Sequence, residues 1–140
     1  MTRIPIGIRQ NNPGNIRTAP QRWQGEIDPP DGADRRFEHF ATPEDGIRAL
    51  CRVLLNYQAK HNLHTVEALI NRWAPPIEND TGAYADHVAR LVGVNPQVRV
   101  DLRVPARLAQ FARAIIEHEN GQQPYSEAQI LEGVRRALLS

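Results

Sequence analysis

Apolar side chains recur every three or four positions through most of the chain beyond residue 42, the spacing that places them on one face of a helix. The pattern predicts five helices, at about residues 43–60, 65–73, 81–92, 105–120 and 126–138. The side chains expected to face inward are Ile47, Leu50, Cys51, Leu54, Leu55, Val66, Leu69, Ile70, Trp73, Tyr84, Val88, Leu91, Leu108, Phe111, Ala112, Ile115, Ile116, Ile130, Leu131, Val134 and Leu138. Together they predict one core built mainly from helices.

Residues that begin and end helices support these boundaries. Thr42, Thr81 and Ser126 are the expected N-caps, because a short polar side chain accepts hydrogen bonds from the free N–H groups of a first turn. Gly93 and Gly121 are expected to end the third and fourth helices, since glycine adopts the left-handed conformation that closes a helix.

The first 40 residues follow a different pattern, rich in Pro, Gly, Asn and Asp. Such a composition predicts loops with one small hairpin. Its strands are expected at Arg22–Ile27 and Arg35–Phe40, separated by the turn residues 29–32. The predicted fold class is therefore mainly α (α+β), with residues 1–140 forming a single domain.

Composition supports a globular chain and argues against two classes of protein. Of the 140 residues 41% are hydrophobic and 24% charged, enough apolar surface for a folded core. The formal net charge of +1, with arginines spread along the chain, does not indicate a nucleic-acid-binding surface. No signal peptide or membrane span is expected. The only cysteine, Cys51, lies in an apolar run and is expected in the core.

Several short segments occur in an order that resembles one known family. They are Asn11-Asn12-Pro13-Gly14-Asn15-Ile16-Arg17, Trp23-x-Gly25, Phe37-x-x-Phe40, Pro43-Glu44-x-Gly46-Ile47-Arg48-Ala49, Arg72-Trp73-Ala74-Pro75-Pro76-x-Glu78-Asn79-Asp80-Thr81-x-x-Tyr84 and Ile115-Ile116-x-His118-Glu119-Asn120-Gly121. As a set they resemble phage virion-associated proteins that are commonly described as lysozyme-like structural proteins. The resemblance covers nearly the whole chain.

The resemblance implies a lysozyme-like helical domain with a small N-terminal β-hairpin and an activity on peptidoglycan. In lysozyme-like enzymes the catalytic Glu ends a helix that precedes the Asn-rich segment, whereas here only ten residues precede Asn11. The helix end that resembles it lies near the other end of the chain, at residues 115–121. This order suggests circular permutation, which neighbouring chain ends would permit.

Glycoside cleavage needs a carboxylic acid beside the scissile oxygen. Glu117 and Glu119 both lie in the last turn of the fourth predicted helix, where the helix dipole disfavours an anion. Residues two apart face different sides, and Glu119 is the expected catalytic acid because Asn120-Gly121 ends the helix beside it. Glu117 and Glu78 are the alternatives. A solvated helix end is the simpler explanation of the same residues.

Other polar and aromatic residues suit a sugar polymer. Amide groups match N-acetyl and hydroxyl groups, a guanidinium matches a lactyl or peptide carboxylate, and flat rings match sugar faces. The predicted substrate-binding residues are Asn11, Asn12, Asn15, Arg17, Trp23, Asp80 and Tyr84. Simpler explanations are Asx turns for the asparagines and helix capping for Asp80. Trp73 could also stack on a sugar, but a place in the core is the simpler explanation for it.

These features predict cleavage of the peptidoglycan glycan strand, as a lysozyme or as a lytic transglycosylase, with one Glu acting first as acid and then as base. No cofactor and no metal are expected, because the histidines lack a ligand spacing. The alternative is a non-catalytic virion structural or glycan-binding protein. The expected partners are peptidoglycan and other virion proteins, without nucleic acid. We expect the chain in the phage virion or the bacterial cytoplasm before delivery to the periplasmic cell wall.

Overall fold

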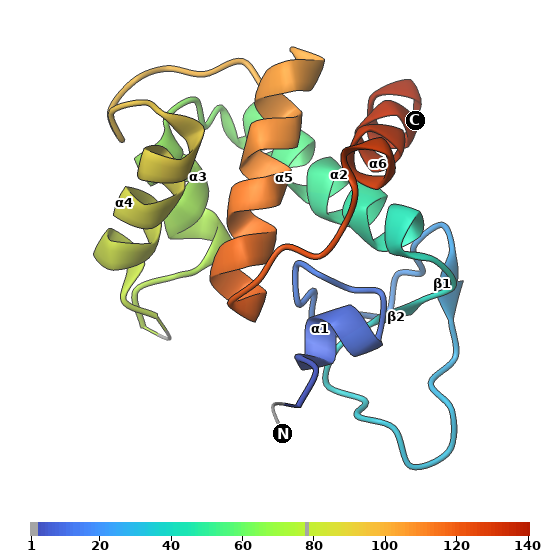
Figure 1. Ribbon diagram of the computed structural model, residues 1–140. Helices are drawn as coiled ribbons and strands as arrows, with labels where there is room; N and C mark the ends of the chain where they lie inside the picture. The colour runs from blue at the N-terminus through green and yellow to red at the C-terminus, as the bar shows by residue number, and fades with distance from the viewer. Residues whose placement is uncertain (1–2, 78) are drawn as a thin grey trace.

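A computed structural model describes residues 3–77 and 79–140 of the chain (Figure 1). Within these residues the elements are α1 (Ile6–Arg9), β1 (Glu26–Ile27), β2 (His39–Phe40), α2 (Pro43–His61), α3 (Val66–Trp73), α4 (Thr81–Val92), α5 (Pro105–Asn120) and α6 (Glu127–Leu139). The two strands pair antiparallel. The mainly helical α+β fold class is thereby confirmed.

The long helices begin and end where short polar residues and glycines allow it. The side chains of Thr42 and Ser126 accept hydrogen bonds from the first turns of α2 and α6, as predicted, and Thr65 does the same for α3. Gly93 and Gly121 end α4 and α5 with left-handed backbones, at φ values of 85° and 71°. These helix ends are therefore encoded locally in the sequence.

Two residues were considered as the cap of α4, and the expectation for Thr81 was wrong whereas that for Asp80 is confirmed. Asp80 is the N-cap, and its Oδ1 accepts from the Ala83 N–H at 3.1 Å. Thr81 is already the first helical residue, and its Oγ1 donates to the Ala74 carbonyl at 2.6 Å. A carboxylate at the cap also complements the positive end of the helix, which favours Asp over Thr here.

The N-terminal region differs from the prediction in two ways. The short helix α1 was not predicted, and each strand of the hairpin has only two residues. The strands are short because residues 36–38 pair with residues 16–18 instead of extending the ladder along residues 22–25. The Thr18 N–H donates to the Arg36 carbonyl at 3.0 Å, and the Glu38 N–H donates to the Ile16 carbonyl at 2.9 Å.

The helices surround one apolar core, and α5 stands in its middle. Figure 1 shows α3 and α4 on one side of α5 and α2 with α6 on the other, while α1 and the hairpin lie below. Leu50 and Leu54 of α2, Phe111 and Ile115 of α5 and Ile130 of α6 are fully buried in this core. Burial of the predicted helix faces therefore holds the layers together.

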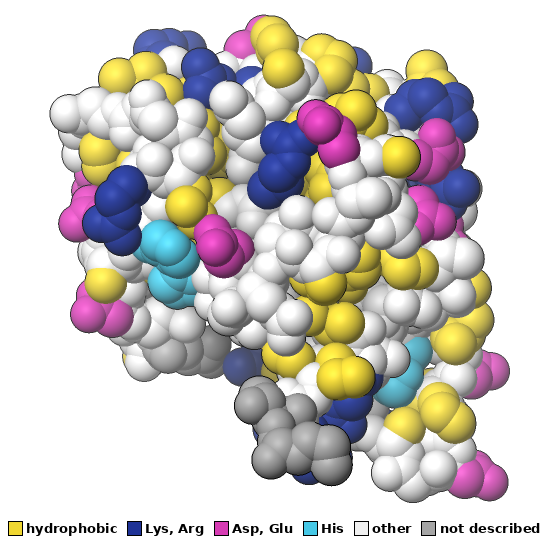
Figure 2. Space-filling view, in the orientation of Figure 1, with side chains coloured by type: hydrophobic (Ala, Val, Ile, Leu, Met, Phe, Trp, Pro, Cys, Tyr) yellow, Lys and Arg dark blue, Asp and Glu magenta, His cyan; other side chains and the backbone are white. Residues whose placement is uncertain are grey.

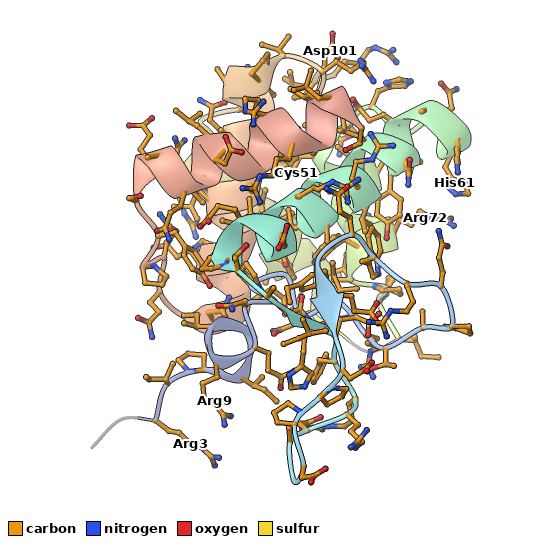
Figure 3. All side chains as sticks on the ribbon, turned by 90° about the vertical axis from the view of Figure 1, so that its right-hand side faces the viewer. Arg3, Arg9, Cys51, His61, Arg72 and Asp101 are labelled. Atoms are coloured by element: carbon orange, nitrogen blue, oxygen red, sulfur yellow. The ribbon has the colours of Figure 1, made fainter. Side chains whose placement is uncertain are left out.

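Most of the predicted inward positions are confirmed, and two are wrong. Leu91 and Leu131 are 45% and 44% exposed, and Leu138 is only partly buried. Cys51 is fully buried among the helices, as expected, and Figure 3 shows it inside the molecule. Burial raises the pKa of its thiol to about 12, so Cys51 acts as a small apolar side chain.

The first helix, α1, and the last, α6, lie apart in the molecule (Figure 1). The circular permutation stays a prediction. In the part of the chain that the structure describes, no helix is both long enough and apolar enough to cross a membrane.

Glu38, beside the hairpin, is buried against another acid. Only 4% of Glu38 is exposed, and its Oε2 has no hydrogen-bond partner among the described residues. Burial, followed by the hydrogen bond and charge of Glu26, raises its pKa from 4.5 to about 7, although Arg22 and the Ala19 N–H act in the opposite direction. The folded chain therefore holds a proton that the unfolded chain releases.

This proton makes stability depend on pH. Between pH 4.5 and about 7 the unfolded chain loses the Glu38 proton while the folded chain keeps it, so stability falls as the pH rises. We expect a loss of about 2 kcal/mol between pH 4.5 and pH 8, measured by urea unfolding. Glu38→Gln should remove most of this loss, and an unchanged pH dependence in that variant would contradict the assignment to Glu38.

Candidate functional site

A cleft of about 400 Å³ lies where the N-terminal loop meets the helices. Its described lining residues are Gly14, Asn15, Ile16, Arg17, Phe37, Val53, Tyr57, Trp73, Ala74, Pro75, Asn79 and Glu119. Residues from both ends of the sequence therefore share one cleft. Glu119 is the only acid among the described lining residues.

Glu119 is held from two sides by neutral donors. Its Oε1 accepts from the Asn15 side-chain amide at 3.0 Å, across 104 positions in the sequence. Its Oε2 accepts from the Tyr84 hydroxyl at 2.6 Å. Asn15 lines the cleft, whereas Tyr84 is only 2% exposed and lies behind it. Oε1 is therefore bonded to a residue of the cleft lining, whereas Oε2 is bonded to a buried residue.

The Asn-rich segment divides into loop-building residues and one cleft residue. Asn12 is fully buried, and its amide bonds both the N–H and the carbonyl of Ile16 at 3.0 Å and the Glu38 carbonyl at 3.0 Å. Asn11 donates to the Phe40 carbonyl at 3.1 Å. Their predicted substrate contacts are therefore corrected to a structural role, because the amides are used within the chain.

Asn15 remains in the cleft because the loop turns there. Asn11 and Asn15 both have positive φ, 54° and 52°, which asparagine tolerates better than most residues. The loop is then fastened to the end of α5, since the Asn120 amide donates to the Pro13 carbonyl at 2.8 Å and to the Ile116 carbonyl at 2.9 Å. This attachment brings Asn15 to Glu119.

The other predicted site residues are distributed around the cleft. Arg17 lines it, and its guanidinium lies 5.7 Å from the centre of the Phe37 ring. Trp73 both lines the cleft and packs against the core, so its two interpretations are compatible. Trp23 lies before β1, outside the lining residues.

Two predicted sugar contacts need correction, and one alternative catalytic acid lies outside the described residues. Tyr84 is too buried to present its ring to a ligand, and it holds Glu119 instead. Asp80 caps α4, as the simpler explanation has it, and does not line the cleft. Glu78 falls outside the residues that the structure describes.

Glu117 faces away from the cleft. It lines a shallow surface depression with Gln110, Arg113 and Gln123, on another side of α5. The expectation that residues two apart on this helix face different sides is thereby confirmed. Among the described residues, no group of three or more His, Cys, Asp or Glu side chains is placed to hold a metal ion.

Sequence reasoning missed several residues of the cleft. Phe37 and Tyr57 provide aromatic surface in the lining, and the Arg72 guanidinium, which is not a lining group, lies 5.4 Å from the centre of the Tyr57 ring. Phe37 was present in the recognised Phe-x-x-Phe segment, so its signal was available. Tyr57 carried no such signal, because it lies on the long helix α2 and only the fold brings it to the cleft.

No profile of a known protein family matches the chain. A curated relative is Protein P5 of Pseudoalteromonas phage PM2, which is 39% identical over 131 residues, covering 91% of this chain and 78% of that protein. The expected relationship to a bacteriophage protein is confirmed, whereas the name of the relative states no activity and peptidoglycan cleavage stays a prediction. Identity at this level over nearly the whole chain shows common ancestry, and the chain belongs to the same family as Protein P5 of phage PM2.

Proposed function

We propose that the chain cleaves the glycan strand of peptidoglycan, with Glu119 as the group that transfers the proton. The observation that carries this proposal is the carboxyl group of Glu119 in the cleft, fixed by Asn15 on one oxygen and by Tyr84 on the other. A carboxyl group that is held in one position beside a cleft is already oriented toward the bond of a bound substrate, so no orientational freedom is lost when it transfers its proton.

The cleft has the surface chemistry of a sugar-binding site. Phe37, Tyr57 and Trp73 provide flat apolar surface, and Asn79 provides an amide. Sugar rings bind aromatic faces through their C–H groups, while their hydroxyl and N-acetyl groups need donors and acceptors. A polymer of amino sugars is therefore the substrate class that we favour.

The proton would pass through Oε1, the oxygen that is bonded to a residue of the cleft lining. A carboxyl oxygen has two lone pairs, so Oε1 can carry a proton while it accepts from Asn15. In the first step this proton goes to the glycosidic oxygen, and the bond to the leaving sugar breaks. The carboxylate then takes a proton from the attacking group, which is either water or a hydroxyl of the same sugar.

The test is digestion of purified sacculi by the purified chain, followed by mass spectrometry of the released fragments. We expect soluble muropeptides. Reducing ends would show hydrolysis by water, and anhydro ends would show internal cyclisation. Binding to sacculi without release of fragments would contradict the enzyme and support the alternative, a glycan-binding virion component.

A further inference from the structure

Two histidines stand behind the Glu119 site, outside the cleft. Nδ1 of His87 on α4 and Nδ1 of His118 on α5 are 2.7 Å apart, which is a hydrogen-bond distance. Both side chains are only partly buried, so the pair is accessible to solvent, and Figure 2 shows histidine side chains at the surface on the side of the molecule where α4 lies. Neither histidine lines the cleft.

The pair contacts the catalytic candidate through one aromatic ring. The His118 ring stacks on the Tyr84 ring with 3.6 Å between centroids and 25° between planes. Tyr84 in turn donates to Glu119 at 2.6 Å. His118 therefore supports the ring whose hydroxyl fixes Oε2, and His87 supports His118.

The Nδ1 contact limits how many protons the pair can hold. One Nδ1 must carry the shared proton while the other accepts it, so the pair can be neutral or singly charged but not doubly charged. The groups acting on His118 are His87 and Tyr84 of α4 and Glu119 of its own helix. Burial and His87 lower the pKa of His118, and Glu119 acts in the opposite direction.

We propose that His87 and His118 are positioning residues, which hold Tyr84 and through it Glu119. A second positive charge on the pair breaks the hydrogen bond between the two rings and releases this support. The inference rests on the proposed function of Glu119. It attributes part of the loss of activity at low pH to two residues that touch neither the cleft nor the carboxyl group.

The test compares His87→Leu with His87→Asn in the full chain. Leucine removes the hydrogen bond, whereas the asparagine amide can occupy the place of Nδ1 and donate to His118 without taking up a proton. We expect His87→Leu to lower kcat about 10-fold with little change in KM, because a displaced catalytic group slows the chemical step while the substrate contacts in the cleft remain. His87→Asn should keep kcat within about twofold and extend activity to lower pH.

A second measurement does not depend on activity. The Tyr84 hydroxyl proton, buried and bonded to a carboxyl oxygen, should give a separate downfield signal in the proton NMR spectrum, identified by its loss in Tyr84→Phe. His87→Leu should shift or broaden this signal. His64→Asn, in the loop between α2 and α3, is the matched control and should change neither signal nor kcat.

The two readouts separate the inference from the function on which it rests. If the wild-type chain releases no fragments but the Tyr84 signal responds to His87→Leu, the positioning contact stands and the proposed function falls. If the chain is active and His87→Leu changes neither kcat nor the signal, the inference is overturned. If the activity of His87→Asn falls at the same acidic pH as that of the wild type, the proposed effect of protonating the pair is overturned.

Discussion

Glu119→Gln should lose about 10³-fold of the activity on sacculi while the chain stays folded. The amide has nearly the size of the carboxyl group, and its oxygen can still accept from Tyr84. It has no acidic proton to give, so the leaving sugar would depart without protonation. The measurement is dye release from labelled sacculi, with thermal unfolding of the same preparation to show that the fold persists.

The substitution also has a small structural cost. The new NH₂ group would face the Asn15 amide, which now donates to Oε1 at 3.0 Å, and two donors would oppose one another. We expect a loss of about 1 kcal/mol in stability, too little to explain a missing activity by unfolding.

Glu117→Gln is the matched control for this prediction. It removes a carboxyl group from the same helix, two residues earlier, on the side that does not face the cleft. Activity within about twofold of the wild type is expected, as for most changes away from a site. Full activity in Glu119→Gln would reject Glu119 as the acid, and a selective loss in Glu117→Gln would move that role to Glu117.

The sequence located Glu119 but not the contacts that hold it. A Glu in the last turn of an apolar helix is visible from residues 115–121 alone. Its contact with Asn15 depends on how the N-terminal loop docks on α5, through a hydrogen bond from Asn120 to Pro13. A contact across more than a hundred residues has no local pattern in a single sequence. The contact of Tyr84 with Glu119 spans 35 positions and also depends on the fold, and Tyr84 was assigned to the sugar instead.

The three asparagines of the N-terminal segment show the same limit. All three have the same hydrogen-bonding groups, and only the fold decides which amides are used within the chain. Asn12 is enclosed by the loop that it closes, Asn11 is bound to β2, and Asn15 is left at the cleft. Residue type alone therefore could not show which asparagines build the loop and which one lies at the cleft.

Helix ends depend on shorter-range contacts than helix faces do. Caps at Thr42 and Ser126 depend on bonds within one turn, so the sequence contains the whole interaction. Leu91 and Leu131 satisfy the helical spacing and are nevertheless exposed, whereas Val92 and Val134 on the same helices are buried. The short helix α1 has four residues, too few to show any period.

Gly46→Ala should destabilise the chain by about 3 kcal/mol, because there is no space for a methyl group between α2 and the N-terminal loop. A Cβ on Gly46 would overlap the carbonyl oxygen of Asn11 and would lie 3.0 Å from Cδ of Pro13. The nearest atom belongs to the backbone and cannot rotate away. The measurement is urea unfolding of the variant and the wild type at one pH.

Gly82→Ala is the control for helix propensity. Gly82 lies in the first turn of α4, and the only described atom near an added Cβ is Asp80 Oδ1 at 3.9 Å. Alanine should therefore stabilise that helix by up to about 1 kcal/mol. Similar changes in both variants would contradict the packing argument. If Gly46→Ala instead pushes residues 11–15 away from α2, Asn15 leaves Glu119, so activity should fall further than the remaining folded fraction explains.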